Sequence, residues 1–324
     1  MKKYIIVSPF NPFPPRNGGE RRIYLLTKKH ATRNRVFFFG PKHSDKVKER
    51  NIHYIKSFQD KKIYRGLSQS LIRSIAPYLK KEHLEICLEF PWQAINLMLL
   101  GKRYILDEHN VEFLRFKRMG YWFWPGIYIY EFLSCHFAKN ITCVSEIDKN
   151  YLIKYFGLNS NKIKIIENPV DREVFYPKDT KNLIRKKLQL KQKDKFILFF
   201  GQLNYKPNIE ALEIIKNEII PRLDSYKKQY KIAVCGAGNG KGFLKEFKHK
   251  NIIFKGFVNK IQDYINASDV VIVPLKSGSG TRIKILEALA CKKRVISTSI
   301  GAEGIKPNKL LEVEDDWNKF VEKI

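Results

Sequence analysis

The sequence predicts an α/β protein built from two doubly wound domains, each with a parallel sheet between layers of helices. Short apolar runs of strand type alternate with helical patterns along the whole chain of 324 residues. A polar segment punctuated by prolines interrupts this alternation near the middle of the chain. The length suffices for two domains of ordinary size. We therefore predict an N-terminal domain over residues 1–176, a linker over 177–195 and a C-terminal domain over 196–324.

In the first half, apolar runs of strand length are separated by helical patterns. The predicted strands are Tyr4–Val7, Val36–Phe39, His53–Ile55, Glu85–Leu88, Tyr104–Leu106, Ile141–Val144 and Ile163–Ile166. The predicted helices between them are Glu20–Lys29, Trp92–Leu99 and Ile147–Tyr155.

The second half repeats the scheme. Its predicted strands are Phe196–Phe200, Ile232–Cys235, Ile252–Phe254, Val270–Val273 and Val295–Ser297. Its predicted helices are Ile209–Leu223, Ile261–Asn266 and Ile283–Cys291. Ligands of doubly wound domains bind at the carboxyl ends of the strands, so we expect the site in a cleft between the two domains.

The chain is strongly basic, with a formal net charge of +29. Such a charge favours anionic partners such as phosphorylated substrates or an anionic membrane surface. The lysines are spread along the chain, and no nucleic-acid-binding signature is visible, so we expect no nucleic acid partner. A general lysine bias in the coding composition explains the charge equally well.

The sequence favours a cytoplasmic protein. Its five cysteines lack the spacing of zinc or redox sites, which predicts buried free thiols in a reducing compartment. We expect no signal peptide and no spanning helix, because no apolar run reaches about 20 residues. Residues 121–132 are rich in aromatic side chains, which suits docking at the inner face of a membrane. A helix packed in the core is the alternative for this segment.

The segment 270–298 carries the strongest functional pattern. An apolar strand runs into the small-residue loop Ser277–Thr281, and a helix follows. The glycines of such a loop permit close approach of a ligand, and free N–H groups at a helix start bind anions. Arg282 and Lys284 stand on the first turn, and Glu287 is a lone carboxylate among apolar residues. This pattern favours a diphosphate on the loop and ribose hydroxyls on the carboxylate, although a surface loop before a basic helix is equally compatible with it.

Three other strand ends carry candidate residues. Gly18 and Gly19 precede a helix and predict a flexible loop that closes over substrate, and His109 with Asn110 follows a strand in a polar run. Gly201, Asn204 and Lys206 follow the third of these strands, Phe196–Phe200. A further strand, Ile232–Cys235, is followed by Gly236, which begins a glycine-rich run over residues 236–240. No D-x-D pair follows a strand, so we expect metal-independent chemistry without a cofactor.

Nine motifs in order resemble the retaining glycosyltransferases of family four, enzymes of the GT-B fold that transfer sugars from nucleotide donors. They are DEHNVE, CVSEID, ENPVDREVFYP, FGQLNYKPNIEAL, VCGAG, FKGFV, YINASDVVIVPL, GSGTRIKILEALA and ISTSIGAEG. The resemblance implies two Rossmann-like domains, with the acceptor site in the first and the nucleotide-diphosphate sugar in the second. It also implies transfer to an acceptor hydroxyl of a glycan or a lipid-linked acceptor, in glycan, glycolipid or cell-envelope polysaccharide synthesis.

The resemblance also assigns roles. Glu287 matches the second glutamate of the E-x₇-E pattern, which holds the donor ribose, and His109 matches a histidine near the reacting sugar. Phe257 and Val258 fall in the loop that contacts the base. The expected catalytic residues are therefore His109, Glu287, Arg282 and Lys284. The expected donor-binding residues are Gly201, Asn204, Lys206, Gly236, Phe257, Val258, Gly278, Ser279, Gly280 and Thr281.

Two positions depart from the family pattern. Ser279 stands where the first glutamate of E-x₇-E is common, and Gln202 stands where many relatives begin a phosphate-binding Arg and Lys. We expect Arg282 and Lys284 to balance the diphosphate instead, with support from Lys206. The missing glutamate keeps open a non-catalytic sugar-nucleotide-binding partner protein, and a nucleotide-sugar epimerase is a third reading that the motif order does not support.

Overall fold

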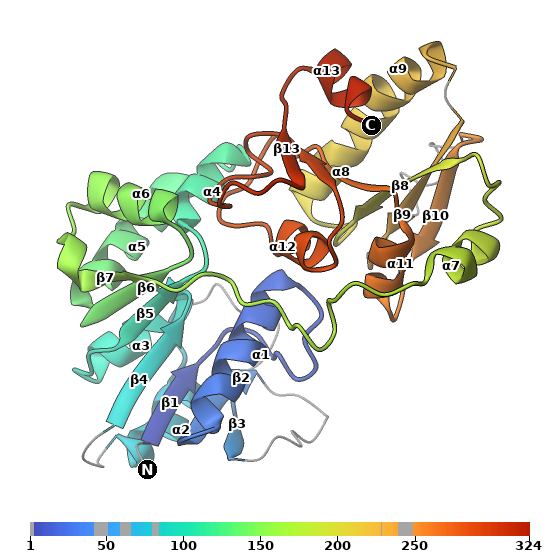
Figure 1. The fold of residues 1–324 in the computed structure, drawn as a ribbon. Coiled ribbons are helices and arrows are strands. Elements are labelled where there is room, and N and C mark those ends of the chain that lie inside the picture. Colours follow the sequence, from blue (N-terminus) through green and yellow to red (C-terminus); the bar gives the residue numbers. More distant parts are fainter. Residues whose placement is uncertain (1–2, 42–50, 59–65, 80–83, 228, 239–248) are drawn as a thin grey trace. The chain divides into compact units, whose positions relative to one another are not determined.

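The computed structural model describes residues 3–41, 51–58, 66–79, 84–227, 229–238 and 249–324. They form two compact units, Met1–Pro169 and Val170–Ile324 (Figure 1). Each unit contains one parallel sheet, and we describe each by itself.

The first unit contains a sheet of seven strands in the order β3-β2-β1-β4-β5-β6-β7. The strands are β1 (Lys3–Val7), β2 (Arg35–Pro41), β3 (Ile52–Phe58), β4 (Leu84–Glu89), β5 (Ile105–Glu108), β6 (Asn140–Cys143) and β7 (Ile163–Ile165). The helices are α1 (Gly18–Ala31), α2 (Gln69–Ile75), α3 (Ala94–Leu99), α4 (Glu112–Arg118), α5 (Trp124–Phe137) and α6 (Glu146–Phe156). The chain winds outward from β1 to one edge and then returns to β4, so the strand order reverses between β1 and β4.

Both faces of this sheet are covered, as a doubly wound fold requires. In β1, Ile5 and Val7 belong to one apolar cluster, and Ile6 belongs to another. The first cluster includes Leu71 of α2, and the second includes Ile23 of α1. Side chains that alternate along the strand thus pack against helices on opposite sides of the sheet.

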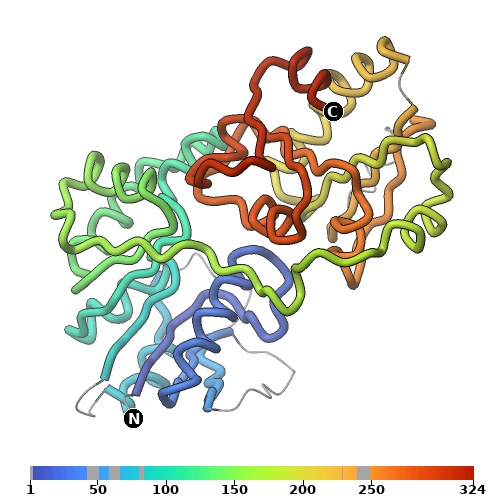
Figure 2. The backbone as a smooth tube through the Cα atoms, viewed as in Figure 1, coloured from blue at the N-terminus to red at the C-terminus, as the bar shows by residue number. Residues whose placement is uncertain are grey.

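The second unit contains six parallel strands in the order β10-β9-β8-β11-β12-β13. The strands are β8 (Lys195–Phe200), β9 (Tyr230–Cys235), β10 (Ile252–Gly256), β11 (Val270–Val273), β12 (Val295–Ser297) and β13 (Leu311–Val313). The helices are α7 (Lys181–Lys187), α8 (Lys206–Ile214), α9 (Ile220–Ser225), α11 (Ile261–Ala267), α12 (Ile283–Ala290) and α13 (Trp317–Glu322), with a π-helical turn, Ile215–Ile219, between α8 and α9. The strand order reverses between β8 and β11, and α13 lies beside α9 (Figure 2).

All twelve predicted strands are present in the structure, and the short strand β13 is an addition. The predicted helix Ile209–Leu223 corresponds to α8, the π-helical turn and α9 together. Helices α2, α4, α7 and α13 were not predicted. The five cysteines are free, and four of them are buried, in agreement with the sequence.

The predicted linker differs from the structure. The division of the chain falls between Pro169 and Val170, and the segment 177–195 contains α7 and packs on the second unit. Backbone N–H of Lys178 donates to Asn266 Oδ1 at 3.0 Å, and Thr180 Oγ1 donates to the carbonyl of Asp263 at 2.8 Å. These contacts explain why a polar segment between prolines is part of a domain.

The aromatic segment 121–132 enters α5, one side of which is anchored in the first unit. The fully buried Glu131 accepts hydrogen bonds from backbone N–H of Glu112 at 2.7 Å and of Phe113 at 2.8 Å. Its carboxyl group thereby caps the start of α4. Within the described residues, no helix is long and apolar enough to cross a membrane.

Candidate active site

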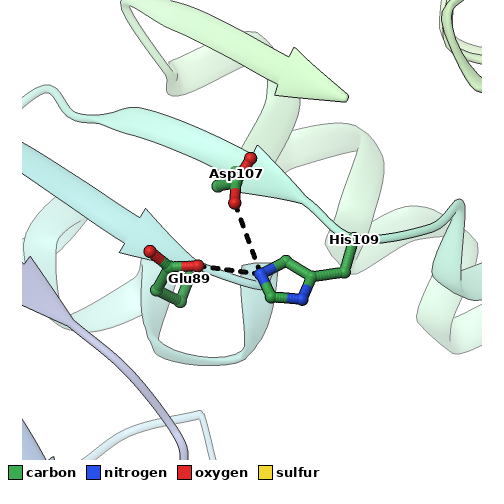
Figure 3. A group of neighbouring side chains, drawn as sticks. All are labelled: Glu89, Asp107 and His109. Atoms are coloured by element: carbon green, nitrogen blue, oxygen red, sulfur yellow. Dashed lines mark hydrogen bonds and ion pairs between the residues drawn. The ribbon is translucent and has the colours of Figure 1, made fainter. Parts of the chain in front are cut away.

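The carboxyl ends of β4 and β5 bring three ionisable side chains together in the first unit (Figure 3). Glu89 is the last residue of β4, Asp107 lies in β5, and His109 follows β5. His109 Nε2 lies 2.8 Å from Glu89 Oε2 and 3.4 Å from Asp107 Oδ2. All three side chains are more than nine-tenths buried.

Arg22 of α1 belongs to the same cluster through its contact with Asp107. Its guanidinium group donates to both oxygens of Asp107, at 2.8 Å from Nε and 2.7 Å from Nη2. Nη1 donates to the carbonyl of Ile166 at 2.8 Å. Burial raises the pKa of Asp107, but the charges and hydrogen bonds of Arg22 and His109 together lower it well below its ordinary value. Asp107 is therefore a carboxylate fixed in position.

The surroundings of His109 favour its protonated form. Burial alone would lower the pKa of His109, but hydrogen bonds to Asp107 and Glu89 and the charges of both carboxylates raise it. Burial and the charge of Asp107 raise the pKa of Glu89. With His109 protonated, the two carboxylates face two cations, and the buried cluster is neutral.

The other ring nitrogen of His109 is available to a ligand. Nδ1 is buried and has no hydrogen-bond partner in the described part of the chain. It faces the start of α1, where an added Cβ on Gly19 would lie 3.7 Å from it. The ring of Phe90 packs on the imidazole ring of His109, with the centroids 3.9 Å apart. The backbone of Phe90 has a φ of +64°, which is unusual for a residue with a side chain. A strained backbone that holds a ring against an ionisable group is typical of functional sites.

Glu89, Asp107 and His109 have the ligand types of a divalent cation site, and their ligand atoms lie within 4.8 Å of one another. However, Arg22 engages both oxygens of Asp107, and Thr142 donates a further hydrogen bond to that carboxylate. A cation bound there would compete with the guanidinium for the same oxygens. The contacts therefore favour an ion-pair network among these residues.

One predicted feature of the first unit, the flexible loop at Gly18 and Gly19, differs from the structure, and the role of Asn110 stays a prediction. Gly18 and Gly19 are the first residues of α1 rather than part of a flexible loop, because Asn17 caps the helix by accepting from backbone N–H of Glu20. Asn110 donates to Glu112 Oε1 at 2.6 Å and is buried.

The second unit places its candidate residues at the reversal of strand order between β8 and β11. Gly201 follows β8, and the loop Ser277–Thr281 lies between β11 and α12. Lys284 of α12 reaches toward the first of these segments. Its Nζ donates to Asn208 Oδ1 at 2.9 Å and lies 4.9 Å from the centre of the Phe199 ring. A Cβ on Gly201 would lie 2.8 Å from this nitrogen, so the amine would have to move, and the φ of +155° at Gly201 also disfavours an L side chain.

Lys284 is a half-buried lysine whose charge is only partly compensated. Burial of its amine and the positive charge of Arg282 lower its pKa to about 7, although the charge of Glu287 opposes both effects. Glu287 is itself 2% exposed, on the same helix. No described residue accepts a hydrogen bond from backbone N–H of Ile283 or Lys284, the first two residues of α12. The amine and the helix start together are suited to an anion.

Arg282 holds the glycine-rich loop Ser277–Thr281 in place through hydrogen bonds to its carbonyl groups. Its guanidinium donates to the carbonyls of Gly280, at 2.5 Å, and Ser279. Gly278 and Gly280 have φ values of +98° and +76°, a backbone conformation that L side chains rarely adopt. Ser277 Oγ donates to Glu210 of α8, which ties the loop to the neighbouring helix. The structure thus assigns Arg282 contacts within the loop that the sequence did not predict.

The remaining predicted donor-binding residues lie in the same unit, at or after the ends of its strands and in the loop before α12. Gly236 lies so close to Gly201 that an added Cβ would meet the Gly201 carbonyl oxygen. Asn204 and Lys206 are exposed at the start of α8, and Phe257 is 69% exposed after β10. Val258 packs on the core of the unit, Ser279 is buried, and Thr281 is half-buried. Asn239 and Gly240 of the predicted glycine-rich run lie outside the described residues.

Sequence reasoning missed four residues of these two centres. Glu89 and Arg22 contact His109 and Asp107, and Asn208 and Glu210 contact Lys284 and Ser277. Glu89 directly follows a predicted strand, Arg22 lies in the first turn of a predicted helix, and Asn208 directly precedes another. These positions at strand ends and helix starts were the available signal for the three residues.

Comparison with known proteins gives two family matches that together cover most of the chain. Residues 16–174 match a family described as Glycosyltransferase Family 4, and residues 194–324 match one described as Glycosyl transferases group 1. The two matches correspond to the two units of the structure.

Curated relatives include three proteins at low identity. The chain is 27% identical over 187 residues to the uncharacterised glycosyltransferase MJ1607 of Methanocaldococcus jannaschii, a match that covers 54% of this chain and 46% of that protein. It is 24% identical over 349 residues to an uncharacterised 44.6 kDa protein in the cps region of Klebsiella pneumoniae, covering 95% and 86% respectively. It is 30% identical over 178 residues, 49% of this chain and 43% of the other, to the Escherichia coli UDP-Gal:alpha-D-GlcNAc-diphosphoundecaprenol alpha-1,3-galactosyltransferase. The chain thus spans less than half of two of these relatives.

Solved structures share the fold over the whole chain. Anabaena Alr3699/HepE in complex with UDP has a TM-score of 0.75 at 15% identity, covering 100% of this chain and 89% of that one. WaaG, a glycosyltransferase involved in lipopolysaccharide biosynthesis, has a TM-score of 0.69 at 14% identity, covering 99% and 89%. With the two parallel-sheet units, these likenesses confirm the predicted GT-B fold.

Proposed function

This chain belongs to the family 4, group 1 glycosyltransferases, and on that basis we propose that it transfers a sugar from a nucleotide-diphosphate sugar to an acceptor hydroxyl with retention of configuration. We further propose that the transfer is metal-independent, that the sugar is a hexose or a related glycosyl group, and that the product is a glycan, a glycolipid or a cell-envelope polysaccharide.

One observation carries this proposal: the half-buried amine of Lys284, with a pKa of about 7, lies at the start of α12 and close to Gly201. An amine whose pKa is lowered in this way gains an opposite charge as its partner when a diphosphate binds. The unpaired N–H groups at the helix start stabilise the same anion. Together these groups favour a diphosphate over a neutral ligand.

The chemistry follows from the growth of charge on the leaving group. Cleavage of the anomeric bond leaves a nucleoside diphosphate that is more negative than the bound donor. Groups fixed in advance around it, Lys284 and the α12 N–H groups, therefore stabilise the transition state more than the ground state. One such interaction is typically worth roughly 3–4 kcal/mol. Arg282 contributes through the loop that it braces, and Glu287 holds the donor ribose.

In the first unit we assign His109 to the transferred sugar. Its unpaired Nδ1, protonated in the neutral cluster with Glu89, Asp107 and Arg22, donates a hydrogen bond to a sugar oxygen. The carboxylates accept from Nε2–H and raise the pKa of His109, which favours the doubly protonated ring with a proton on Nδ1 as well. They act as positioning residues for His109.

The relatives suggest which donor and acceptor to test first. HepE was solved with UDP and with UDP-glucose, and the Escherichia coli relative is named as a UDP-Gal enzyme acting on a diphosphoundecaprenol-linked sugar. The Klebsiella relative lies in a cps region. We therefore propose a uridine nucleotide donor and a lipid-linked acceptor, with the protein peripheral at the inner face of the membrane.

Calorimetric titration of the full chain with UDP, GDP, ADP and their hexose derivatives tests this proposal. We expect one nucleotide series to bind and to raise the melting temperature, and Glu287→Ala to weaken its binding. Glu322→Ala, at an exposed position in the same unit, is the matched control and leaves binding unchanged. Absence of binding for every nucleotide contradicts the proposal.

Ser279, in the place of the common first glutamate, favours one alternative: a homologue that binds the donor without turning it over. Donor hydrolysis or transfer by the purified chain separates the two. Binding without any release of nucleoside diphosphate, in the presence of lipid-linked acceptors, would identify a partner protein.

A further inference from the structure

Helix α5 exposes an apolar face to solvent. Trp122 just before the helix is 87% exposed, and Ile129 and Leu133 within it are 60% and 53% exposed. With Pro125 and Gly126, these residues recur at intervals of three and four, which places them on one side of a helix. Glu131, Ser134 and Cys135 are buried on the opposite side. His136 is exposed on the same side near the end of the helix. We name the five exposed residues before it, Trp122, Pro125, Gly126, Ile129 and Leu133, the α5 face.

The segment around this face carries cations and no exposed anion. Between Glu112 and Glu146 the sequence contains a single acidic residue, Glu131, and that side chain is buried under the helix. Lys117 and Arg118 precede α5, and Lys139 follows it.

Several of these cations rest on aromatic rings. Lys117 Nζ lies 4.7 Å from the centre of the Trp124 ring, and the Arg103 guanidinium lies 5.6 Å from that of Phe137 at the other end of the helix. Arg118 lies 5.6 Å from the Tyr151 ring. An apolar helix face bounded by cations and aromatic rings is the composition of a helix that lies in a membrane interface.

We propose that the α5 face is the surface by which this chain lies on an anionic lipid bilayer, with Trp122, Ile129 and Leu133 among the lipids and the cations at the headgroups. A helix of 14 residues is about 21 Å long, too short to span the hydrocarbon core. It therefore lies along the surface. This inference rests on the peripheral membrane association proposed above and names the surface that makes the contact. Vesicle binding by that surface can be measured without donor or acceptor.

The charge argues against a second copy of the chain as the occupant. Apposition of two α5 faces would bring the same cations together in a chain of net charge +29, without an exposed acid in the segment to pair with them. An anionic bilayer supplies both the apolar layer and the opposite charge.

Flotation of the full chain with vesicles tests the inference. We expect binding to vesicles of phosphatidylcholine mixed with phosphatidylglycerol and much weaker binding to phosphatidylcholine alone. Trp122→Ser with Ile129→Ser reduces binding to the anionic vesicles by roughly tenfold or more, from the lost apolar burial. Lys117→Gln with Lys139→Gln reduces it by about fivefold for each charge removed.

Matched substitutions in the second unit serve as controls. Leu183→Ser removes an apolar side chain that is 67% exposed, and Lys186→Gln with Lys319→Gln removes two exposed charges. We expect both to bind vesicles as the unchanged chain does. All variants should bind the nucleotide identified by calorimetry equally well, which separates this inference from the proposed donor site.

Two results would overturn the inference. One is equal flotation of the unchanged chain and the Trp122 and Ile129 variant, or no flotation with anionic vesicles at all. The other is a dimer in analytical ultracentrifugation that the same two substitutions dissociate, since that would make the α5 face an interface between copies.

Discussion

His109 Nε2 and Glu89 Oε2 lie 2.8 Å apart at the ends of two adjacent strands, and both side chains are buried. This contact fixes the imidazole ring and its proton, and it leaves Nδ1 facing the start of α1 without a partner among the described residues. With the role proposed for His109, activity depends on a carboxylate that need not touch substrate.

Glu89→Gln should lower the pKa of His109, because it removes one of the two negative charges that raise it. If protonated His109 is the active form, activity is lost as pH rises through that pKa, and the loss moves to lower pH in the variant. A pH profile of kcat/KM measures the shift. Glu146→Gln, at an exposed site of the same unit, should keep the original profile. Coincident profiles for Glu89→Gln and the unchanged chain would contradict the positioning role.

Gly201→Ala should weaken donor binding by about tenfold or more, since overpacking typically costs roughly 1–3 kcal/mol. The added Cβ would lie 2.7 Å from Asn208 Nδ2 and 2.8 Å from Lys284 Nζ, so the amine must move. Gly126→Ala, where nothing lies within 4 Å, is the control. Calorimetry with the identified nucleotide compares the two, and equal affinities would show that the Lys284 position is unimportant.

Arg282→Met should destabilise the second unit by about 1–3 kcal/mol, because the loop carbonyls lose a charged donor. Donor affinity should fall as well, since the loop is no longer braced. Arg294→Met breaks a half-exposed pair with Glu312 and should cost about 1 kcal/mol or less. Urea unfolding measures both variants. Unchanged stability of Arg282→Met with lost affinity would instead support direct contact of Arg282 with the diphosphate.

Lys284→Met should stabilise the free protein while it abolishes donor binding. The pKa of the amine is about 7 in the folded chain and 10.5 as the ordinary value, so the unfolded chain binds more protons between these values. The charged amine of Lys284 therefore destabilises the folded chain fully below pH 7, and this destabilisation disappears as pH rises toward 10.5. Each unit of pKa difference corresponds to about 1.4 kcal/mol of stability that the substitution recovers. The Asn208 oxygen loses its donor in the variant, which offsets part of this recovery. We therefore expect Lys284→Met to raise the free energy of unfolding by about 2 kcal/mol below pH 7. Urea unfolding at several pH values tests this sign. A gain that grew with pH would contradict it.

The strands were predictable because a parallel strand buried on both faces is a short, nearly continuous apolar run, as Val270–Val273 illustrates. Strand β13 gave no such signal, since its three residues include Glu312 and the exposed Val313. The segment 177–195 looked like a linker because the contacts of Lys178 and Thr180 with α11 are made by backbone and hydroxyl groups.

Within the site, local patterns revealed the glycine-rich loop, Lys284 and His109. The partners of these residues were not predictable, because the contacts join distant positions: Lys284 and Asn208 are 76 residues apart, and Arg22 and Asp107 are 85 apart. Nor does a sequence indicate the direction of a side chain, and so the contact of Arg282 with carbonyls of its own loop emerged only from the structure.

Proton uptake on donor binding tests the central claim most directly. At a pH about one unit above the pKa of Lys284, most of its amine is neutral, and a bound diphosphate should return its proton. We predict that calorimetry of the identified nucleotide sugar, in buffers of different ionisation enthalpy, gives an uptake of nearly one proton for the unchanged chain. The uptake should vanish well below pH 7, where the amine is already charged. Binding by the unchanged chain without proton uptake would contradict the assignment of the diphosphate to Lys284.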